Sequence, residues 1–329
     1  MAFRLERDES VSDGLRRVIR EELKSAAELL ANGMNDNPDE AIHEARKSVK
    51  KVRAVLRMAY PDPDGAPSRE NASLRDIAGR LSEFRDDAAI IETFDDLKKA
   101  HKPKRAPAGF RSVRAGLVRQ LRHARNDDVT AVLHEASGNL LESRKRMKAW
   151  AARDLNGYDA LAPGLEKTYR RGRKALTRAL RVRSPENLHE LRKRVKDHWY
   201  HVRLLEGIWS ETMGAREKSL KDLETWLGED HNLVVLSERL AAEPSKYGNK
   251  RDLESVLRSS RDWQTELRQK ALPLAERVYE EKPGEFIRRM KHLWQIWKAE
   301  ADSIPDSLPG KDALPRKKPA AQGNSLPAA

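Results

Sequence analysis

One eight-residue pattern occurs twice in this chain of 329 residues, once in each half. Residues 43–50 are His-Glu-Ala-Arg-Lys-Ser-Val-Lys and residues 189–196 are His-Glu-Leu-Arg-Lys-Arg-Val-Lys, so six of the eight positions are identical. The copies are 146 residues apart, and such self-similarity predicts an internal duplication. A chain of this length also exceeds the size at which one hydrophobic core usually stops growing. We therefore expect two lobes, each bringing one basic helix to a common place.

Each copy of the pattern is predicted to lie on an amphipathic helix. With about 100° between successive residues, the cations of each copy share one arc and the apolar residues share the adjoining face. The first cationic stripe consists of His43, Arg46, Lys47, Lys50, Arg53 and Arg57. The second consists of His189, Arg192, Lys193, Lys196 and Arg203, with Tyr200 on the same arc. Neither arc holds an Asp or Glu of its own.

The apolar residues of the rest of the sequence recur at helical spacing, and no stretch has the alternation typical of a strand. Each half opens with a basic helix, in which Arg17, Arg20 and Lys24 correspond to Lys167, Arg170 and Lys174. Four helical units, the basic helix included, make up the first lobe. The sequence therefore predicts an all-α fold with a first lobe at residues 1–158, a second lobe at residues 159–302, and a disordered, basic, Pro-rich tail at residues 303–329.

The charge balance points to an anionic partner. The chain has 65 Lys and Arg against 52 Asp and Glu, a net charge of +13 and a pI near 9.8. Nucleic acid, an anionic membrane and a phosphate polymer all agree with this charge. The alternative to an anionic partner is a helical protein whose surface charges pair with one another in salt bridges, since 36% of the residues are charged.

The composition also excludes several classes of protein. The chain has no cysteine, which rules out disulfides, thiolate metal sites and cysteine nucleophiles. Neither a signal sequence nor an apolar run long enough to span a bilayer is present. We therefore expect a cytoplasmic protein with no membrane partner.

Signals for catalysis are weak. His43-Glu44 and His189-Glu190 begin like the zinc motif HExxH, but the place of the second histidine is taken by Lys47 and Lys193. His198 and His201 are three residues apart, yet no carboxylate cluster completes a metal site. Phosphate-loop, dinucleotide and nucleophile-elbow motifs are also missing. We expect no catalytic residues, no metal and no cofactor.

The chemistry of the stripes suits phosphate. The guanidinium group of arginine matches phosphate oxygens with two parallel hydrogen bonds, and lysine adds a mobile point charge. Cations spaced along one helix at 1.5 Å per residue form a ladder about 15–20 Å long rather than a pocket, and a ladder fits a polymer. The alternative is a solvated charged face, which normally interleaves acidic residues for pairing.

These residues carry a resemblance to a known family. The two His-x-x-Arg-Lys-x-x-Lys helices each follow a basic helix and precede a Leu-rich helix with a polar turn, at Arg85-Asp86 or at His231-Asn232. Over roughly residues 5–300 this order resembles the CHAD family, the conserved histidine α-helical domain, in its stand-alone form. The metal-binding ExExK motif of the CYTH domain, to which CHAD domains are often fused, does not occur near the N-terminus.

The resemblance implies a fold, a ligand and a set of site residues. It implies two four-helix bundles related by a pseudo-two-fold axis, with basic helices lining a central groove or pore that binds inorganic polyphosphate. Association with polyphosphate granules is known for some members. The implied binding residues are both cationic stripes and four cations of the first helices, Arg20, Lys24, Arg170 and Lys174.

One departure and two alternatives accompany this hypothesis. Trp199 stands where the first copy has Arg53, so the two faces are not expected to bind identically. Nucleic-acid binding is the first alternative, favoured by the pI and the basic tail but not by any recognised motif or cluster of stacking aromatics. A metal-dependent phosphohydrolase that uses the histidines is the second alternative.

Overall fold

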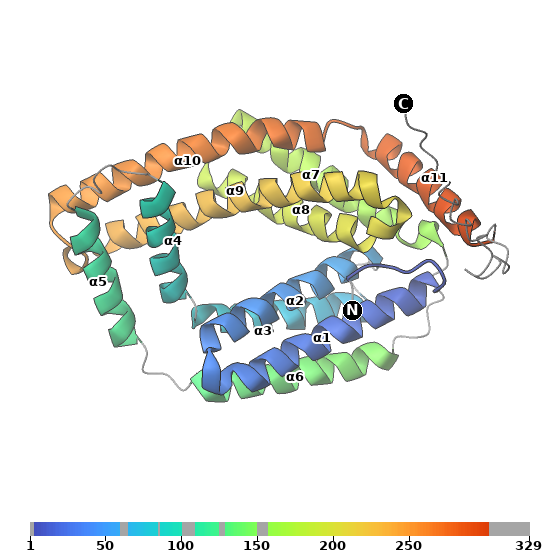
Figure 1. Ribbon diagram of the computed structural model, residues 1–329, viewed down its shortest axis with the longest axis horizontal. Coiled ribbons are helices and arrows are strands. Elements are labelled where there is room, and N and C mark those ends of the chain that lie inside the picture. The colour runs from blue at the N-terminus through green and yellow to red at the C-terminus, as the bar shows by residue number, and fades with distance from the viewer. Residues whose placement is uncertain are drawn as a thin grey trace, which may run out of the picture.

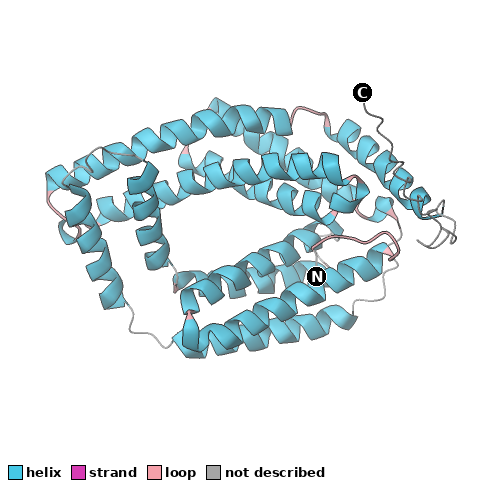
Figure 2. Ribbon diagram, viewed as in Figure 1, coloured by secondary structure: helices cyan, strands magenta, loops and turns pink. Residues whose placement is uncertain are grey.

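Helices form every regular element of the described part of the chain. The computed structural model describes residues 3–59, 65–84, 86–100, 109–124, 129–149 and 157–302, and all of these ranges are helices and connecting turns (Figure 2). The predicted all-α fold is confirmed. The predicted tail at residues 303–329 lies outside the described residues. No described helix is both long and apolar enough to cross a bilayer.

Eleven α-helices follow one another through the described residues (Figure 1). They are α1 (Val11–Asp36), α2 (Pro38–Ala59), α3 (Ala66–Glu83), α4 (Asp86–Ala100), α5 (Gly109–Ala124), α6 (Val129–Ala149), α7 (Ala162–Arg181), α8 (Pro185–Leu204), α9 (Ser210–Ala242), α10 (Lys250–Val278) and α11 (Pro283–Asp302). The two copies of the repeated pattern lie on α2 and α8.

Both of these helices begin at a proline. Pro38 opens α2, and Pro185 opens α8 directly after the cap residue Ser184. The Ser184 hydroxyl accepts a hydrogen bond from the Asn187 backbone N–H at 3.3 Å. Such a cap satisfies an N–H group that has no partner within the helix, and proline is tolerated in the first turn because its missing N–H is not needed there.

Four helices, α1, α2, α3 and α6, form the first lobe. α1 packs along α2 and α6, while α3 contacts both α2 and α6, so the four helices enclose one core. Leu23, Ile42 and Leu74 are fully buried in it. The Ser137 hydroxyl of α6 donates a hydrogen bond to the Ala27 carbonyl of α1 at 2.9 Å. The first lobe thus includes α6 but neither α4 nor α5.

The helices α4 and α5 pack instead against the far ends of α9 and α10, at the left of Figure 1. A separate apolar core forms there from Ile90, Phe94, Leu97, Phe110, Val113 and Leu117 together with Leu233, Leu236, Leu240, Tyr247, Leu253, Val256 and Leu267. The other helices of this second lobe are α7 and α8, and α11 lies against α7. The division of the chain at residue 158 stays a prediction. The helices α4 and α5 come before that residue in the sequence but pack against α9 and α10, which come after it.

The helix that follows the repeated pattern is interrupted in the first half of the chain and continuous in the second. α9 runs without interruption through His231 and Asn232, whereas α3 ends at Glu83 and α4 begins at Asp86. The predicted polar turn at His231-Asn232 is therefore wrong, because Leu233 continues the helix into the core shared with α10. Arg85 lies outside the described residues. The pseudo-two-fold relation of two bundles, with a central groove or pore, stays a prediction.

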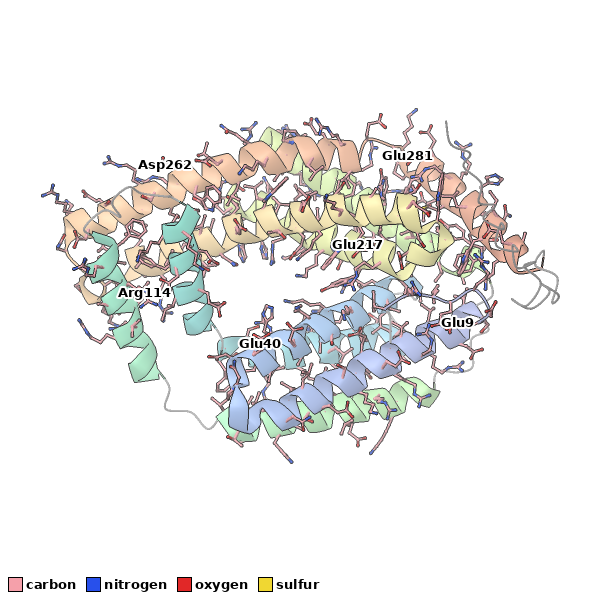
Figure 3. The ribbon with its side chains drawn as sticks, in the orientation of Figure 1. Glu9, Glu40, Arg114, Glu217, Asp262 and Glu281 are labelled. Atoms are coloured by element: carbon pink, nitrogen blue, oxygen red, sulfur yellow. The ribbon has the colours of Figure 1, made fainter. Side chains whose placement is uncertain are left out.

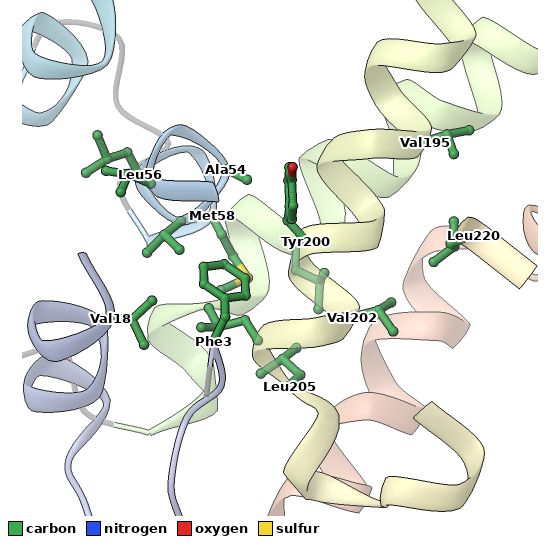
Figure 4. Packing of buried hydrophobic residues seen from close by; sticks show 14 of the residues in the cluster. Phe3, Val18, Ala54, Leu56, Met58, Val195, Tyr200, Val202, Leu205 and Leu220 are labelled. Carbon is green, nitrogen blue, oxygen red and sulfur yellow. The ribbon is translucent and has the colours of Figure 1, made fainter. Parts of the chain in front are cut away.

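The two lobes meet where α2 packs against α8, a contact that we call the seam. Buried side chains from both helices lie there, among them Met58 and Tyr200, with Phe3 of the N-terminal segment beside them (Figure 4). His201 Nε2 of α8 hydrogen bonds to the Ala54 carbonyl of α2 at 2.9 Å. The His201 ring nitrogen therefore donates this bond, and a backbone carbonyl of one lobe is satisfied by a side chain of the other.

The close approach of α7 to α2 gives a test of this packing. A Cβ atom added at Gly164 would lie 1.9 Å from the Met58 carbonyl oxygen, and a helical backbone cannot move aside. We expect Gly164→Ala to lower the free energy of unfolding by about 1–3 kcal/mol or more, as overpacking does. Urea denaturation measures this change.

Gly138 of α6 is the matched control, because nothing lies within 4 Å of a Cβ added there. Gly138→Ala should raise the free energy of unfolding by about 0.5–1 kcal/mol through helix propensity. Equal effects of the two substitutions would contradict the proposed contact between α2 and α7.

Candidate anion-binding site

The repeated pattern brings cations from both lobes together at the seam. Lys50 of α2 is partly buried. The positive charges of Arg46, on the same helix, and of Arg192 and Lys196, on α8, act on its ammonium group. We call these four residues the seam cations. Burial, followed by the charges of Lys196, Arg46 and Arg192, lowers the pKa of Lys50 to about 7. Side chains ending in nitrogen extend from both lobes into the space between them (Figure 3).

A single buried carboxylate, Glu224 of α9, holds three cations together. Its Oε1 accepts hydrogen bonds from Lys196 Nζ at 2.7 Å and from Arg192 Nη2 at 3.5 Å, and its Oε2 lies 3.4 Å from Lys221 Nζ. Burial acts to raise the pKa of Glu224, but the charge and hydrogen bond of Lys196 and the charges of Arg192 and Lys221 lower it to about 2. Glu224 is therefore ionised at every physiological pH.

Glu224 was not predicted from the sequence, although a signal for it exists. It lies one residue after Leu223, four after Leu220 and three before Leu227, on the buried face of α9. An acidic residue at such a position is rarely buried without a partner. The residue that precedes Glu224 by 146 positions is Ala78 in α3, so the first half offers Lys50 no matching carboxylate.

Further along α2, Arg53 and Arg57 share a neutral partner. The Asn71 side-chain oxygen lies 3.0 Å from Arg53 Nε and 3.4 Å from Arg57 Nη1. Arg57 Nη2 also donates to Asp197 Oδ1 of α8 at 2.5 Å, which links the two helices. Burial and the charge of Arg57 lower the pKa of Arg53 to about 10, so its guanidinium group stays charged at neutral pH.

The matching end of α8 is better neutralised. Arg203, which corresponds to Arg57, pairs with Glu217 Oε1 at 3.2 Å, and Glu217 is the counterpart of Asn71. The Arg203 guanidinium also lies 5.2 Å from the ring centre of Trp199 and 5.6 Å from that of Phe3. A cation held over an aromatic face is stabilised by the charge distribution of the ring.

Lys47 and Lys193 of the stripes have acidic partners on their own helices. Lys47 Nζ donates to Glu44 Oε1 at 2.6 Å, and Lys193 Nζ lies 3.7 Å from Glu190 Oε2. Neither glutamate belongs to the cationic arc, but a spacing of three residues brings each one within reach of its lysine. His43 Nε2 lies 3.8 Å from Glu44. The side chains of His43, Lys47 and Lys193 are more exposed than those of Arg192 and Lys196.

The imidazole ring of the histidine in the second copy lies against that of another histidine, tilted by 36°. The ring centres of His189 on α8 and His231 on α9 are 4.0 Å apart. Burial, then the charges of Lys193 and Arg192, lowers the pKa of His189. Burial and the neighbouring His189 lower the pKa of His231 to about 4. His231, which was predicted only as part of a turn, thus lies beside the repeated pattern.

Four predicted residues of the first helices are not joined to the seam by any described contact. Lys24 pairs with Glu28 on its own helix at 3.5 Å, and Arg170 pairs with Glu166 on its own helix. Lys174 is exposed and Arg20 is partly buried. Their part in binding stays a prediction.

The closely spaced histidines of α8 are structural. His198 and His201 are fully buried, and His198 Nε2 accepts a hydrogen bond from Arg216 Nε at 3.3 Å. Within the described ranges, no group of three or more His, Cys, Asp or Glu side chains is arranged to hold a metal ion. These two histidines pack the interior of α8 against its neighbours.

Comparisons with known proteins agree with this fold. The model of the CHAD domain family matches residues 17–241, and the chain belongs to that family. The chain is similar to the crystal structure of the CHAD domain from the plant Ricinus communis, at 17% identity and a TM-score of 0.56, over 86% of this chain and 96% of that one. It is also similar to PptA from Streptomyces chartreusis, at 16% identity and a TM-score of 0.53, over 83% of this chain and 100% of that one. No curated protein matches the chain significantly.

The buried histidines predict a loss of stability in mild acid. Burial lowers the pKa of His201 to about 4 and that of His198 well below its ordinary value, while histidine in an unfolded chain titrates near pH 6.5. Between about pH 6.5 and 4 the unfolded chain therefore binds protons that the folded chain does not. The free energy of unfolding should fall by about 2–4 kcal/mol from pH 7 to pH 5, as measured with urea.

A histidine substitution separates this effect from the titration of carboxylates. His201→Gln should reduce the dependence of stability on pH, whereas His134→Gln, at an exposed position of α6, should leave it unchanged. The same pH dependence in both variants would exclude His201 as its source.

Proposed function

We propose that this CHAD domain protein binds inorganic polyphosphate along the seam and catalyses no reaction on it. The observation that carries the proposal is the imbalance of charge around Lys50. Three seam cations act on its ammonium group, and Glu224 is the described carboxylate that acts against them. Positive charge held at low dielectric is costly, and a bound anion lowers that cost.

Phosphate is the anion that this set of side chains recognises best. Arg46 and Arg192 each offer a planar guanidinium group, which can donate two parallel hydrogen bonds to phosphate oxygens, and lysines beside them supply point charges. The protein would hold a phosphate with charge-assisted hydrogen bonds, which are the stronger class.

A linear polymer fits the arrangement better than a single phosphate. The cations of α2 extend from Arg46 to Arg57, about 16 Å along the helix axis, and α8 offers a second row from Arg192 to Arg203. A chain of phosphates could contact several cationic side chains of both rows at once. The outer residues His43, Lys47, His189 and Lys193 would extend these rows beyond the seam cations.

Family membership supports the same ligand, because the CHAD resemblance implies polyphosphate binding. Affinity for polyphosphate would also bring the protein to polyphosphate granules in the cytoplasm. The two rows would not contribute equally, because Trp199 takes the place of a cation and Glu217 pairs with Arg203 in the second half.

Removing one arginine from each helix tests the site. Arg46→Ala/Arg192→Ala should weaken polyphosphate binding at least 100-fold at fixed salt, since a hydrogen bond to a charged group contributes about 1.5–3 kcal/mol. Isothermal titration calorimetry measures the affinity.

The control removes the same charge elsewhere. Arg80 and Arg114 are exposed and pair with Glu135 and Asp95, and Arg80→Ala/Arg114→Ala should change the affinity less than threefold. Equal losses in the two double variants would mean that net charge, not the seam, attracts the polymer.

Replacing the buried carboxylate should have the opposite effect on binding. Glu224→Gln removes the negative charge that competes with phosphate for Arg192 and Lys196, so polyphosphate should bind about tenfold more tightly. The free protein should also be less stable, because buried cations lose a partner. Glu238→Gln, an exposed change on the same helix, should alter neither property, and unchanged affinity in Glu224→Gln would contradict the competition.

Competition distinguishes polyphosphate from nucleic acid. At equal phosphate concentration, single-stranded RNA or DNA should not displace bound polyphosphate, although both should bind less tightly as salt rises. Displacement by nucleic acid would favour the alternative function. Release of phosphate in the presence of a divalent metal, lost in His43→Ala or His189→Ala, would instead indicate a phosphohydrolase.

A further inference from the structure

A cavity lies between α1 and α2 in the first lobe, beside the N-terminal segment. Its volume is about 350 Å³, within the range of roughly 300–1,000 Å³ for pockets that hold small molecules. Phe3, Val18 and Leu29 form its apolar part, and the first two of these side chains are labelled in Figure 4. None of the described residues that line the cavity belongs to either cationic stripe, so this cavity is separate from the seam.

The charge of the cavity is opposite to that of the whole chain. Three carboxylates line it, those of Glu21 and Glu22 on α1 and of Glu44 on α2, together with one ammonium group, that of Lys51. These side chains have a formal charge of −2, because three negative charges are set against one positive charge, whereas the chain carries +13. Non-specific attraction by such a chain favours anions, so a cation that binds here is held by the cavity itself.

Lys51 shows how the cavity holds an alkylammonium group. Its Nζ donates a hydrogen bond to Glu22 Oε1 at 2.7 Å and lies 5.5 Å from the centre of the Phe3 ring. The carboxylate provides a charge-assisted hydrogen bond, and the face of the ring attracts the cation through its quadrupole. Lys51 thus neutralises Glu22 and leaves the charges of Glu21 and Glu44.

The cations that pair with these other two carboxylates do not line the cavity. Glu21 Oε2 lies 3.7 Å from Arg17 Nη1, but Arg17 donates a shorter hydrogen bond to Glu9, at 2.6 Å. Glu44 pairs with Lys47, whose side chain is 44% exposed, and an ion pair of this kind contributes little to stability. A cation inside the cavity can therefore compete for both carboxylates.

A buried hydroxyl group also faces the cavity. Ser48 of α2 lines the cavity and is only 6% exposed. Its hydroxyl makes no hydrogen bond with any described residue, although buried hydroxyl groups are normally paired because leaving one without a partner is costly. A ligand with an N–H group would supply the missing bond, since a hydroxyl oxygen accepts hydrogen bonds.

We propose that this cavity binds an aliphatic diamine in its doubly protonated form. The two ammonium groups would pair with Glu21 and Glu44 and balance the formal charge of −2, and one of them would also donate to the Ser48 hydroxyl. The methylene chain would pack against Val18 and Leu29, as the apolar stem of a lysine does on an apolar surface. A bare metal ion would leave that apolar surface uncovered, and the described residues offer no group of three or more ligands for one. This site does not depend on polyphosphate binding at the seam.

The probe for the full chain is 1,4-diaminobutane. Isothermal titration calorimetry at neutral pH and low salt should show saturable binding of one diamine per chain, and the diamine should raise the melting temperature. Glu21→Gln/Glu44→Gln should weaken binding at least tenfold and abolish the rise in melting temperature, because both hydrogen bonds lose their charge assistance. Ser48→Ala, which removes only the hydroxyl group, should weaken binding about threefold.

The control removes the same charge from the same two helices, outside the cavity. Glu28 of α1 and Glu40 of α2 are exposed and do not line the cavity, so Glu28→Gln/Glu40→Gln should change the affinity less than twofold. Equal losses in the two double variants would overturn the proposal, because long-range charge rather than the cavity would then hold the diamine.

Matched ligands test the need for two charges. The diol 1,4-butanediol has the same carbon chain and no charge, and it should not bind. The monoamine n-butylamine has one ammonium group, and it should bind at least tenfold more weakly than the diamine. Absence of saturable diamine binding at millimolar concentration, or equal binding of the diamine and the diol, would likewise overturn the proposal.

Discussion

Like charges are held together where α2 packs against α8, and much of the structure serves to tolerate that repulsion. Apolar side chains such as Met58 and Tyr200 hold the helices in contact, and the hydrogen bond from His201 to the Ala54 carbonyl fixes their register. Glu224 and Asp197 each contribute one negative charge from the second lobe. The positive potential that is left at the seam is therefore maintained by the packing of the fold rather than by the mobility of surface side chains.

The sequence predicts the helices and their cationic faces because both follow from a local period of 3.6 residues. It also predicts, through the repeat, that two such helices belong to one site. Glu224 could not be placed among the cations in this way, because the contact joins residues 28 and 32 positions apart on different helices. The turn expected at His231-Asn232 was wrong because it too depended on a contact distant in sequence. Two polar residues do not end a helix when the residues that follow are buried in a core, and Leu233 is buried in the core that α9 shares with α10.

The duplication has preserved the helices while changing the charges between them. Ala78, Asn71 and Arg53 of the first half correspond to Glu224, Glu217 and Trp199 of the second. Each difference leaves the first half more positive or the second half more neutral. A polymer lying between the halves would therefore meet one strongly charged row and one row in which acidic and aromatic side chains moderate the charge.

The packing of α4 and α5 on α9 and α10 has a consequence for the order in which the protein folds. During synthesis the apolar faces of α4 and α5 emerge more than 100 residues before their partners around Val256. All four helices of the first lobe are present once α6 is made, but Phe94 and Phe110, which contact each other, lack the rest of their core until the second half of the chain is made. Nascent proteins aggregate or recruit chaperones through exposed apolar surfaces of this kind. The apolar faces of α4 and α5 can be fully buried only after α9 and α10 have been made.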